Sequence, residues 1–233
     1  MSRTRSRSPV GRQAAGQDGF TYVEVTISLG LLVVVMGAFV IALEGGSNGL
    51  ATGAARGMLS ARAGEALAAM DADLREAAAA KITTEQTGLP ANQCAVVLPC
   101  ARDSSGAFVV NGAYRPAWQA VVVYCPHVSS KGVSQLRRYV YFDPTYTFPF
   151  QVLEITADTI RLRDAGGQTL DVDRERGNPA LPAGREFHVL CPGLTELAVE
   201  VGAPTRLSIQ ASCLTRRNVS LDIEAERYVA HRN

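Results

Sequence analysis

The chain of 233 residues lacks the short motifs that mark common enzyme and metal sites. No serine stands in a Gly-x-Ser-x-Gly context, so nucleophilic hydrolysis has no support. The three histidines, His127, His188 and His231, lack metal-ligand spacing, and we interpret them as surface or strand residues. No Cys-x-x-Cys occurs, which disfavours a zinc ribbon. The 23 basic and 22 acidic residues form no basic patch, so DNA binding is not indicated. We therefore expect no enzyme.

Charged residues are also missing from a long segment near the N-terminus. The run from Val25 to Leu43 contains none, and with residues 20–23 it reaches the roughly 20 residues that span a bilayer. No basic residue follows this run before Arg56. Four arginines precede it: Arg3, Arg5, Arg7 and Arg12. The positive-inside rule therefore predicts a single pass, with the N-terminus in the cytoplasm and the rest of the chain outside.

Two simpler readings of this segment remain open. A cleaved secretory signal peptide usually has a shorter apolar region and a small-residue cleavage site, and Ala42-Leu43-Glu44 is a poor one. A plain signal anchor also needs only basic flanks and an apolar span. Neither reading gives a reason for the pattern Gly-Phe-Thr-x-x-Glu at positions 19–24. A charge in hydrocarbon is costly, so Glu24 is by default a functional-site hypothesis.

Glu24 belongs to the hexapeptide Gly-Phe-Thr-Tyr-Val-Glu at positions 19–24. This hexapeptide, followed by an apolar run, resembles the processing site of the type IV pilin and type II secretion pseudopilin superfamily. The resemblance implies that a prepilin peptidase cuts between Gly19 and Phe20 and methylates the new amino group of Phe20. Glu24 would then be the fifth residue of the mature chain. Further implied partners are other pilin or pseudopilin subunits and an assembly platform in the bacterial inner membrane.

The new α-amine of Phe20 would lie one helical turn from Glu24. The two opposite charges can neutralise each other, and the amine of one subunit could pair with Glu24 of a neighbour, which would fix the axial stagger of a filament. Removing one partner of such a pair leaves an uncompensated charge. In the alternative interpretation, Glu24 simply lies in the headgroup layer of an anchor.

We expect four segments: a leader peptide (1–19), a transmembrane and assembly helix (20–43), a periplasmic continuation of that helix (44–83) and a β-rich head (90–233). Apolar residues at three- and four-residue spacing, from Leu59 to Ala78, predict one buried helix face. Five residues, Gly45-Gly46-Ser47-Asn48-Gly49, interrupt the helical pattern, so we expect a kink or melted segment there. A linker between two separate helices is the alternative.

After Pro90 the pattern changes to short β-rich runs. They predict strands near 120–125, 136–142, 152–156, 159–162, 186–190, 194–201, 206–211 and 219–228, with a loop at 126–134. Successive short strands with brief turns indicate an antiparallel sheet. The predicted fold class is α+β and pilin-like: a long N-terminal transmembrane helix whose C-terminal half packs on an antiparallel β-sheet head.

One segment at the end of the predicted helix and one segment of the head sharpen the resemblance. Residues 70–77 (Met-Asp-Ala-Asp-Leu-Arg-Glu-Ala) look like the helix end of larger minor pilins and pseudopilins of the PilW and GspJ type. Residues 135–139 (Gln-Leu-Arg-Arg-Tyr) resemble their strands that end in Leu-x-Arg. The resemblance implies a structural minor subunit that primes or caps a type IV pilus or a type II secretion pseudopilus, used for adhesion, motility, secretion or DNA uptake. The protein would lie in the inner membrane before assembly, with its head in the periplasm or outside.

The cysteines, one acidic segment and one aromatic run each have both a functional and a structural interpretation. Cys94 could pair with Cys100 across a short loop, and Cys191 with Cys213 across a strand pair, although one of the five cysteines stays unpaired. Residues 164–173, with Asp164, could hold calcium, but a polar hairpin turn is favoured because Asp and Gly are turn residues. We expect the aromatic run 139–150 to pack in the core and at sheet edges, and the alternative is that some of its rings form a contact surface on the head. The alternative function is a membrane-anchored protein that binds calcium or DNA and is not assembled into a filament.

Overall fold

The computed structural model describes residues 21–181, 187–202, 204–214 and 220–230. The predicted leader, the cleavage residues Gly19 and Phe20, and His231 lie outside the described residues. The chain divides into two compact units, Met1–Leu50 and Ala51–Asn233, and each is described by itself.

The first element is the α-helix α1, Tyr22–Glu76. Residues 45–49 are helical, so the prediction that the glycine cluster melts the helix is wrong. Each glycine costs only about 0.5–1 kcal/mol relative to alanine. Propagating an existing helix through such a segment avoids the costly step of starting a new one.

The helix ends at Glu76, well before the predicted end near Thr83. The Ala77 amide makes its last helical bond to Asp73 O (3.1 Å), and Ala78 then adopts an extended conformation before a short 3-10 turn, η1 (Ala79–Lys81). The alanine run 77–80 favours a helix by only fractions of a kcal/mol per residue. The next segment, β1 (Thr83–Glu85), pairs with β2 of the sheet. This pairing requires the chain to turn, so it overrides the helix preference of the alanine run.

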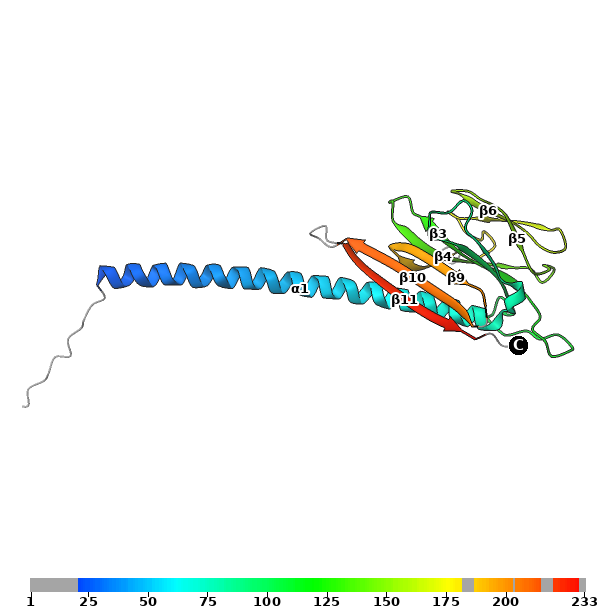
Figure 1. Cartoon of the computed structure of the whole chain (residues 1–233), viewed down its shortest axis with the longest axis horizontal. Helices are drawn as coiled ribbons and strands as arrows, with labels where there is room; N and C mark the ends of the chain where they lie inside the picture. The colour runs from blue at the N-terminus through cyan, green and yellow to red at the C-terminus, as the bar shows by residue number, and fades with distance from the viewer. Residues whose placement is uncertain (1–20, 182–186, 203, 215–219, 231–233) are drawn as a thin grey trace, which may run out of the picture. The chain divides into compact units, whose positions relative to one another are not determined.

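The second unit contains three antiparallel sheets, which confirms the expected α+β layout (Figure 1). The central sheet has the order β1-β2-β3-β4-β8, where β2 is Ala95–Cys100, β3 Ala120–Val128, β4 Ser134–Phe142 and β8 His188–Pro192. The C-terminal sheet has the order β11-β10-β9, where β9 is Leu194–Glu200, β10 Thr205–Leu214 and β11 Ser220–Val229. The outer sheet is β5-β6-β7, with bounds Gln151–Ile155, Thr159–Arg163 and Thr169–Asp173.

Most predicted strands are confirmed within a few residues, including the tight β5–β6 hairpin. The predicted loop at 126–134 is too long, because β3 continues to Val128 and β4 begins at Ser134, so that only a short turn separates them. Strands β1, β2 and β7 were not predicted. The turn between β6 and β7 is the polar hairpin turn favoured for residues 164–168.

The central sheet is buried on both faces. On β3, Val122 and Tyr124 pack in one core with Leu67 and Met70 of α1, while Val121 and Val123 pack in a second core. The second core also holds residues of the outer sheet and the aromatic residues Tyr139, Tyr141, Phe148 and Phe150. Successive side chains of a strand point to opposite faces, so a strand covered on both sides needs an uninterrupted apolar run. The expected packing of the aromatic run 139–150 is confirmed for these four aromatic residues, whereas Phe142 is exposed and Tyr146 is only partly buried.

Candidate functional site: the capped start of the apolar helix

Glu24 lies in the first turn of α1, where its carboxylate closes the helix start. Its Oε2 accepts hydrogen bonds from the Thr21 amide (2.9 Å) and the Thr21 hydroxyl (3.0 Å). In return, Thr21 Oγ1 accepts a bond from the Glu24 amide (3.3 Å). This reciprocal arrangement is a capping box, which satisfies amides that a helix start otherwise leaves unpaired. Sequence reasoning missed this role, although the pattern Thr-x-x-Glu before an apolar run signals it.

The capping box also places the Glu24 carboxylate close to the predicted cleavage point. The Thr21 amide that it binds belongs to the residue directly after Phe20. Among the described residues, the Glu24 carboxylate therefore contacts the residue that follows the predicted cleavage pair Gly19 and Phe20.

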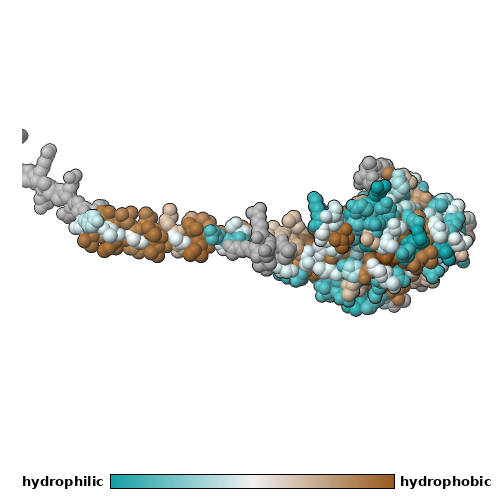
Figure 2. Space-filling model, turned by 90° about the horizontal axis from the view of Figure 1, so that it is seen from above, coloured by the Kyte–Doolittle hydropathy of each residue, from teal (hydrophilic) through white to brown (hydrophobic). Residues whose placement is uncertain are grey.

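The helix behind this cap presents an exposed apolar surface. The large apolar side chains between Tyr22 and Leu43 are 44–86% exposed, and the most apolar 18-residue window has no buried residue. Figure 2 shows these hydrophobic residues gathered along this segment. The helix is long and apolar enough to cross a membrane by length and composition. Such a continuous surface requires lipid or protein cover.

The far end of α1 is fixed to the central sheet by a partly buried polar triad. The Asp73 carboxylate accepts hydrogen bonds from Tyr124 Oη (2.5 Å) and from Arg138 Nε (2.8 Å) and Nη2 (3.2 Å). Tyr124 is fully buried, and burial together with the nearby Asp73 charge raises its pKa well above 10. The tyrosine therefore stays a neutral donor. The triad unites the two segments that carry the PilW and GspJ resemblance.

Two other acids of the same helix end also contact arginines. Asp71 Oδ1 accepts a bond from Arg75 Nε, four residues later in α1, at 2.7 Å, and Asp71 Oδ2 lies 3.0 Å from Arg227 on β11. Glu76 accepts bonds from the Arg102 guanidinium, one of them 3.1 Å long. The acids of residues 70–77 therefore act as attachment points between the helix and the head rather than as free catalytic groups.

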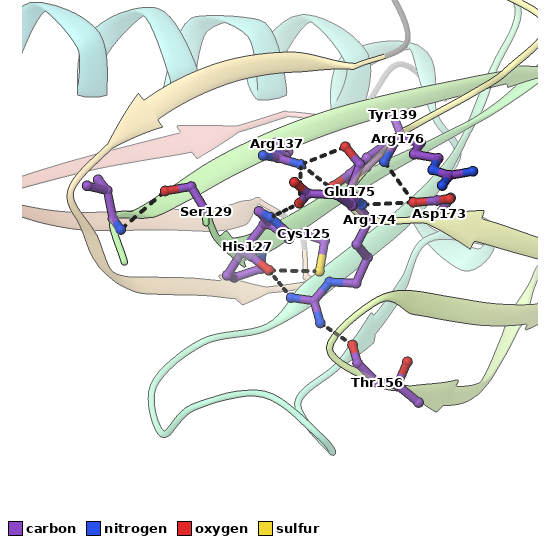
Figure 3. Close-up of polar contacts among 12 residues, drawn as sticks. Cys125, His127, Ser129, Arg137, Tyr139, Thr156, Asp173, Arg174, Glu175 and Arg176 are labelled. Atoms are coloured by element: carbon purple, nitrogen blue, oxygen red, sulfur yellow. Dashed lines mark hydrogen bonds and ion pairs between the residues drawn. The ribbon is translucent and has the colours of Figure 1, made fainter. Parts of the chain in front are cut away.

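A second polar cluster, drawn in Figure 3, joins the central sheet to the segment after β7. Arg137 Nη1 donates to Arg174 O (2.5 Å), and the Arg174 guanidinium donates to the carbonyls of Pro126 and Thr156. His127 is 5% exposed, and its Nε2 lies 3.0 Å from Glu175 Oε2. Arg137 and Arg174 donate these hydrogen bonds to backbone carbonyls. This arrangement indicates a role in holding the central sheet and the segment after β7 together.

This environment makes His127 a source of acid sensitivity. Burial and the positive charges of Arg137 and Arg174 lower its pKa, although Glu175 opposes the shift. The unfolded chain therefore takes up a proton that the folded chain resists, and stability is lost as the pH falls below about 6.5, the ordinary histidine value. We expect the unfolding free energy, measured by urea titration at pH 7.5 and 5.5, to fall less in His127→Asn than in the unchanged protein. An equal fall in both would contradict this assignment.

Neither of the two possible cysteine pairs is formed in the structure, in which all five cysteines are free thiols. Pairing of Cys94 with Cys100 is excluded because the residues between them form strand β2 and not a loop. An extended strand separates their Cα atoms by roughly 20 Å, whereas a disulfide needs about 4.4–6.8 Å. Cys191 and Cys213 are likewise unbonded. Burial raises the pKa of Cys94 to about 12 and that of Cys191 to about 11, so these thiols are poor nucleophiles.

Asp164 and Asp171 of the acidic segment 164–173 are engaged by other groups of the chain. Asp164 accepts bonds from the amides of Thr147 (2.8 Å) and Gln168 (2.7 Å), which shape the β6–β7 turn. Asp171 pairs with Arg161 at 2.8 Å, so a guanidinium stands where a cation ligand set would need space. In the described part of the chain, no group of three or more His, Cys, Asp or Glu side chains is placed to hold a metal ion.

Comparison with protein-family models, with curated proteins and with solved structures finds no match to this chain. Assignment of a function therefore depends on the chemistry of its own residues.

Proposed function

We propose that this protein is a minor pilin or pseudopilin that is processed between Gly19 and Phe20 and assembled through α1. The observation that carries the proposal is the position of Glu24. Its carboxylate caps the start of an exposed apolar helix by binding Thr21, the residue directly after Phe20, whose amine would become a positive charge on cleavage.

Because the apolar side chains of residues 22–43 are exposed, such a subunit would need an apolar environment both before and after assembly. Lipid would cover the apolar side chains before assembly, and neighbouring helices would cover them in a filament. Burial of Glu24 among neighbouring helices is costly unless the carboxylate is paired. The Phe20 amine of an adjacent subunit would provide that partner and would set the axial stagger between subunits.

The head favours a minor subunit over one present in many copies. Its strands account for a large part of the 233-residue chain, and its polar clusters connect structural layers. We therefore assign it a structural role, priming or capping a pilus or pseudopilus from the periplasmic side of the inner membrane. The prepilin peptidase, the other subunits and the membrane platform are the proposed partners.

The direct test is mass spectrometry of the N-terminus of the protein purified from its native membrane. We expect a chain that begins with N-methylated Phe20. The matched control is Gly19→Val, which places a branched side chain at the cut and is expected to leave the leader attached. A native protein that retains Met1, or that is cut near Leu43, would refute the proposal.

A further inference from the structure

The head contains a cleft of about 1150 Å³ that none of the roles above uses. One wall is formed by residues 78–81 around η1, and the other by residues 114–119, with Pro144 and Tyr146. Small-molecule pockets usually have volumes of about 300–1,000 Å³, so the cleft is large enough for an extended ligand.

Three aromatic side chains line this cleft: Tyr114, Trp118 and Tyr146. Two of them, Trp118 and Tyr146, pack against aromatic residues of the second core. The Trp118 ring packs edge-on against Phe148 with centroids 6.3 Å apart, and the Tyr146 ring packs against Phe150 at 5.3 Å. Phe148 and Phe150 belong to the second core, so these rings are fixed parts of the wall. Rigid aromatic rings contribute large contact area at low entropic cost.

Tyr114 stands at the rim and is 89% exposed. Its φ of 56° is in the left-handed region, which is unusual for a bulky residue. Asn111 holds this conformation, since its Oδ1 accepts bonds from the amides of Ala113 and Arg115 (both 3.0 Å), and its carbonyl accepts one from the Tyr114 amide (2.9 Å). The loop therefore keeps a large aromatic side chain exposed to solvent.

The charges of the cleft are positive. Among the described residues, neither Lys81 nor Arg115 has a carboxylate within ion-pair distance, and Lys81 Nζ lies 5.6 Å from the centre of the Trp118 ring. The only acid of the lining, Glu76, is occupied by Arg102. The cleft thus combines two available cations with three aromatic rings and the amides of Asn111 and Gln119.

We propose that this cleft binds a carboxylated oligosaccharide. The C–H faces of sugar rings pack on aromatic rings, their hydroxyl groups bond to amide side chains, and their carboxylates pair with Lys81 and Arg115. A peptide that adds a strand would need an open sheet edge, whereas the walls here are a 3-10 turn and loops. Single-stranded nucleic acid needs a basic groove along its backbone, and this chain has almost equal numbers of acidic and basic residues.

The test is isothermal titration calorimetry on the full chain in detergent micelles, with tetragalacturonic acid as the probe. We expect binding that weakens about tenfold in Tyr114→Gly and in the double variant Lys81→Gln/Arg115→Gln. Glycine adopts a positive φ without strain, so Tyr114→Gly removes the ring and leaves the loop. Lys131→Gln, at an exposed turn between β3 and β4, is the matched control and should bind as the unchanged protein does.

Three parallel probes complete the experiment: neutral maltotetraose, an oligothymidylate and a poly-glutamate peptide. Maltotetraose should bind at least tenfold more weakly than tetragalacturonate, because it lacks the carboxylates. The proposal is overturned if tetragalacturonate gives no binding, if the cleft variants bind it as well as Lys131→Gln does, or if the nucleotide or peptide binds more tightly. These results are independent of leader cleavage, so they do not depend on the proposed role in a filament.

Discussion

Replacing Glu24 with glutamine is expected to remove the protein from filaments while leaving it processed and inserted in the membrane. Glutamine keeps an acceptor oxygen of nearly the same shape, so it can still cap Thr21 at the helix start. What it loses is the negative charge that, in the proposed filament, pairs with the Phe20 amine of a neighbour. Breaking a buried charge pair costs about 3–5 kcal/mol, which corresponds to a loss of incorporation of about a hundredfold or more.

The measurement is the ratio of protein in sheared filaments to protein in the membrane fraction, determined by quantitative immunoblot. Thr21→Ala is the matched control, because it removes the capping hydroxyl but keeps the charge of Glu24. Loss of a cap costs about 1 kcal/mol, so incorporation of this variant should stay within about tenfold of the unchanged protein. Normal assembly of Glu24→Gln would rule out the charge pair as the basis of the stagger.

The largest stability effect is expected from Asp73→Ala. This change leaves the Tyr124 hydroxyl and the Arg138 guanidinium without their carboxylate in a partly buried site. Removing one member of such a pair costs about 3–5 kcal/mol, a large part of the 5–15 kcal/mol that stabilises a typical domain. Urea titration in detergent micelles, followed by the fluorescence of Trp118, the only tryptophan, measures this loss.

Two variants separate the triad from ordinary surface pairing. Tyr124→Phe removes one hydrogen bond and keeps the packed ring, so a loss of about 1 kcal/mol is expected. Glu65→Ala breaks the pair with Arg62, in which both side chains are more than half exposed, and should change stability by less than about 0.5 kcal/mol. An Asp73→Ala loss as small as that of Glu65→Ala would show that the triad is not a stabilising connection.

The sequence predicted best those features that depend on local patterns. The β-rich run 219–228 correctly indicated β11, and the absence of charge from Val25 to Leu43 correctly indicated a long apolar segment, which is helical in the structure. Strand β2 gives no such local signal, because both of its faces are buried and its residues therefore do not alternate between apolar and polar.

Features set by tertiary contacts could not be predicted in this way. Nothing local to Asp73 identifies Arg138 as its partner, since the pair forms only when the helix packs on β3 and β4. The early helix end at Glu76 likewise depends on the pairing of β1 with β2. The aromatic cleft brings together η1, the loop 111–119 and Tyr146, which are distant in the sequence.

Because of the capping box at the start of α1, formation of the helix does not depend on the proposed cleavage of the leader. Thr21 and Glu24 both lie after the proposed cut, so removal of residues 1–19 would take away none of the hydrogen bonds that begin the helix. The leader would then serve for targeting and topology, and the helix could form in the membrane before or after the peptidase acts. An uncleaved precursor would already have the helix start of the mature subunit, and cleavage would add only the positive charge of the Phe20 amine.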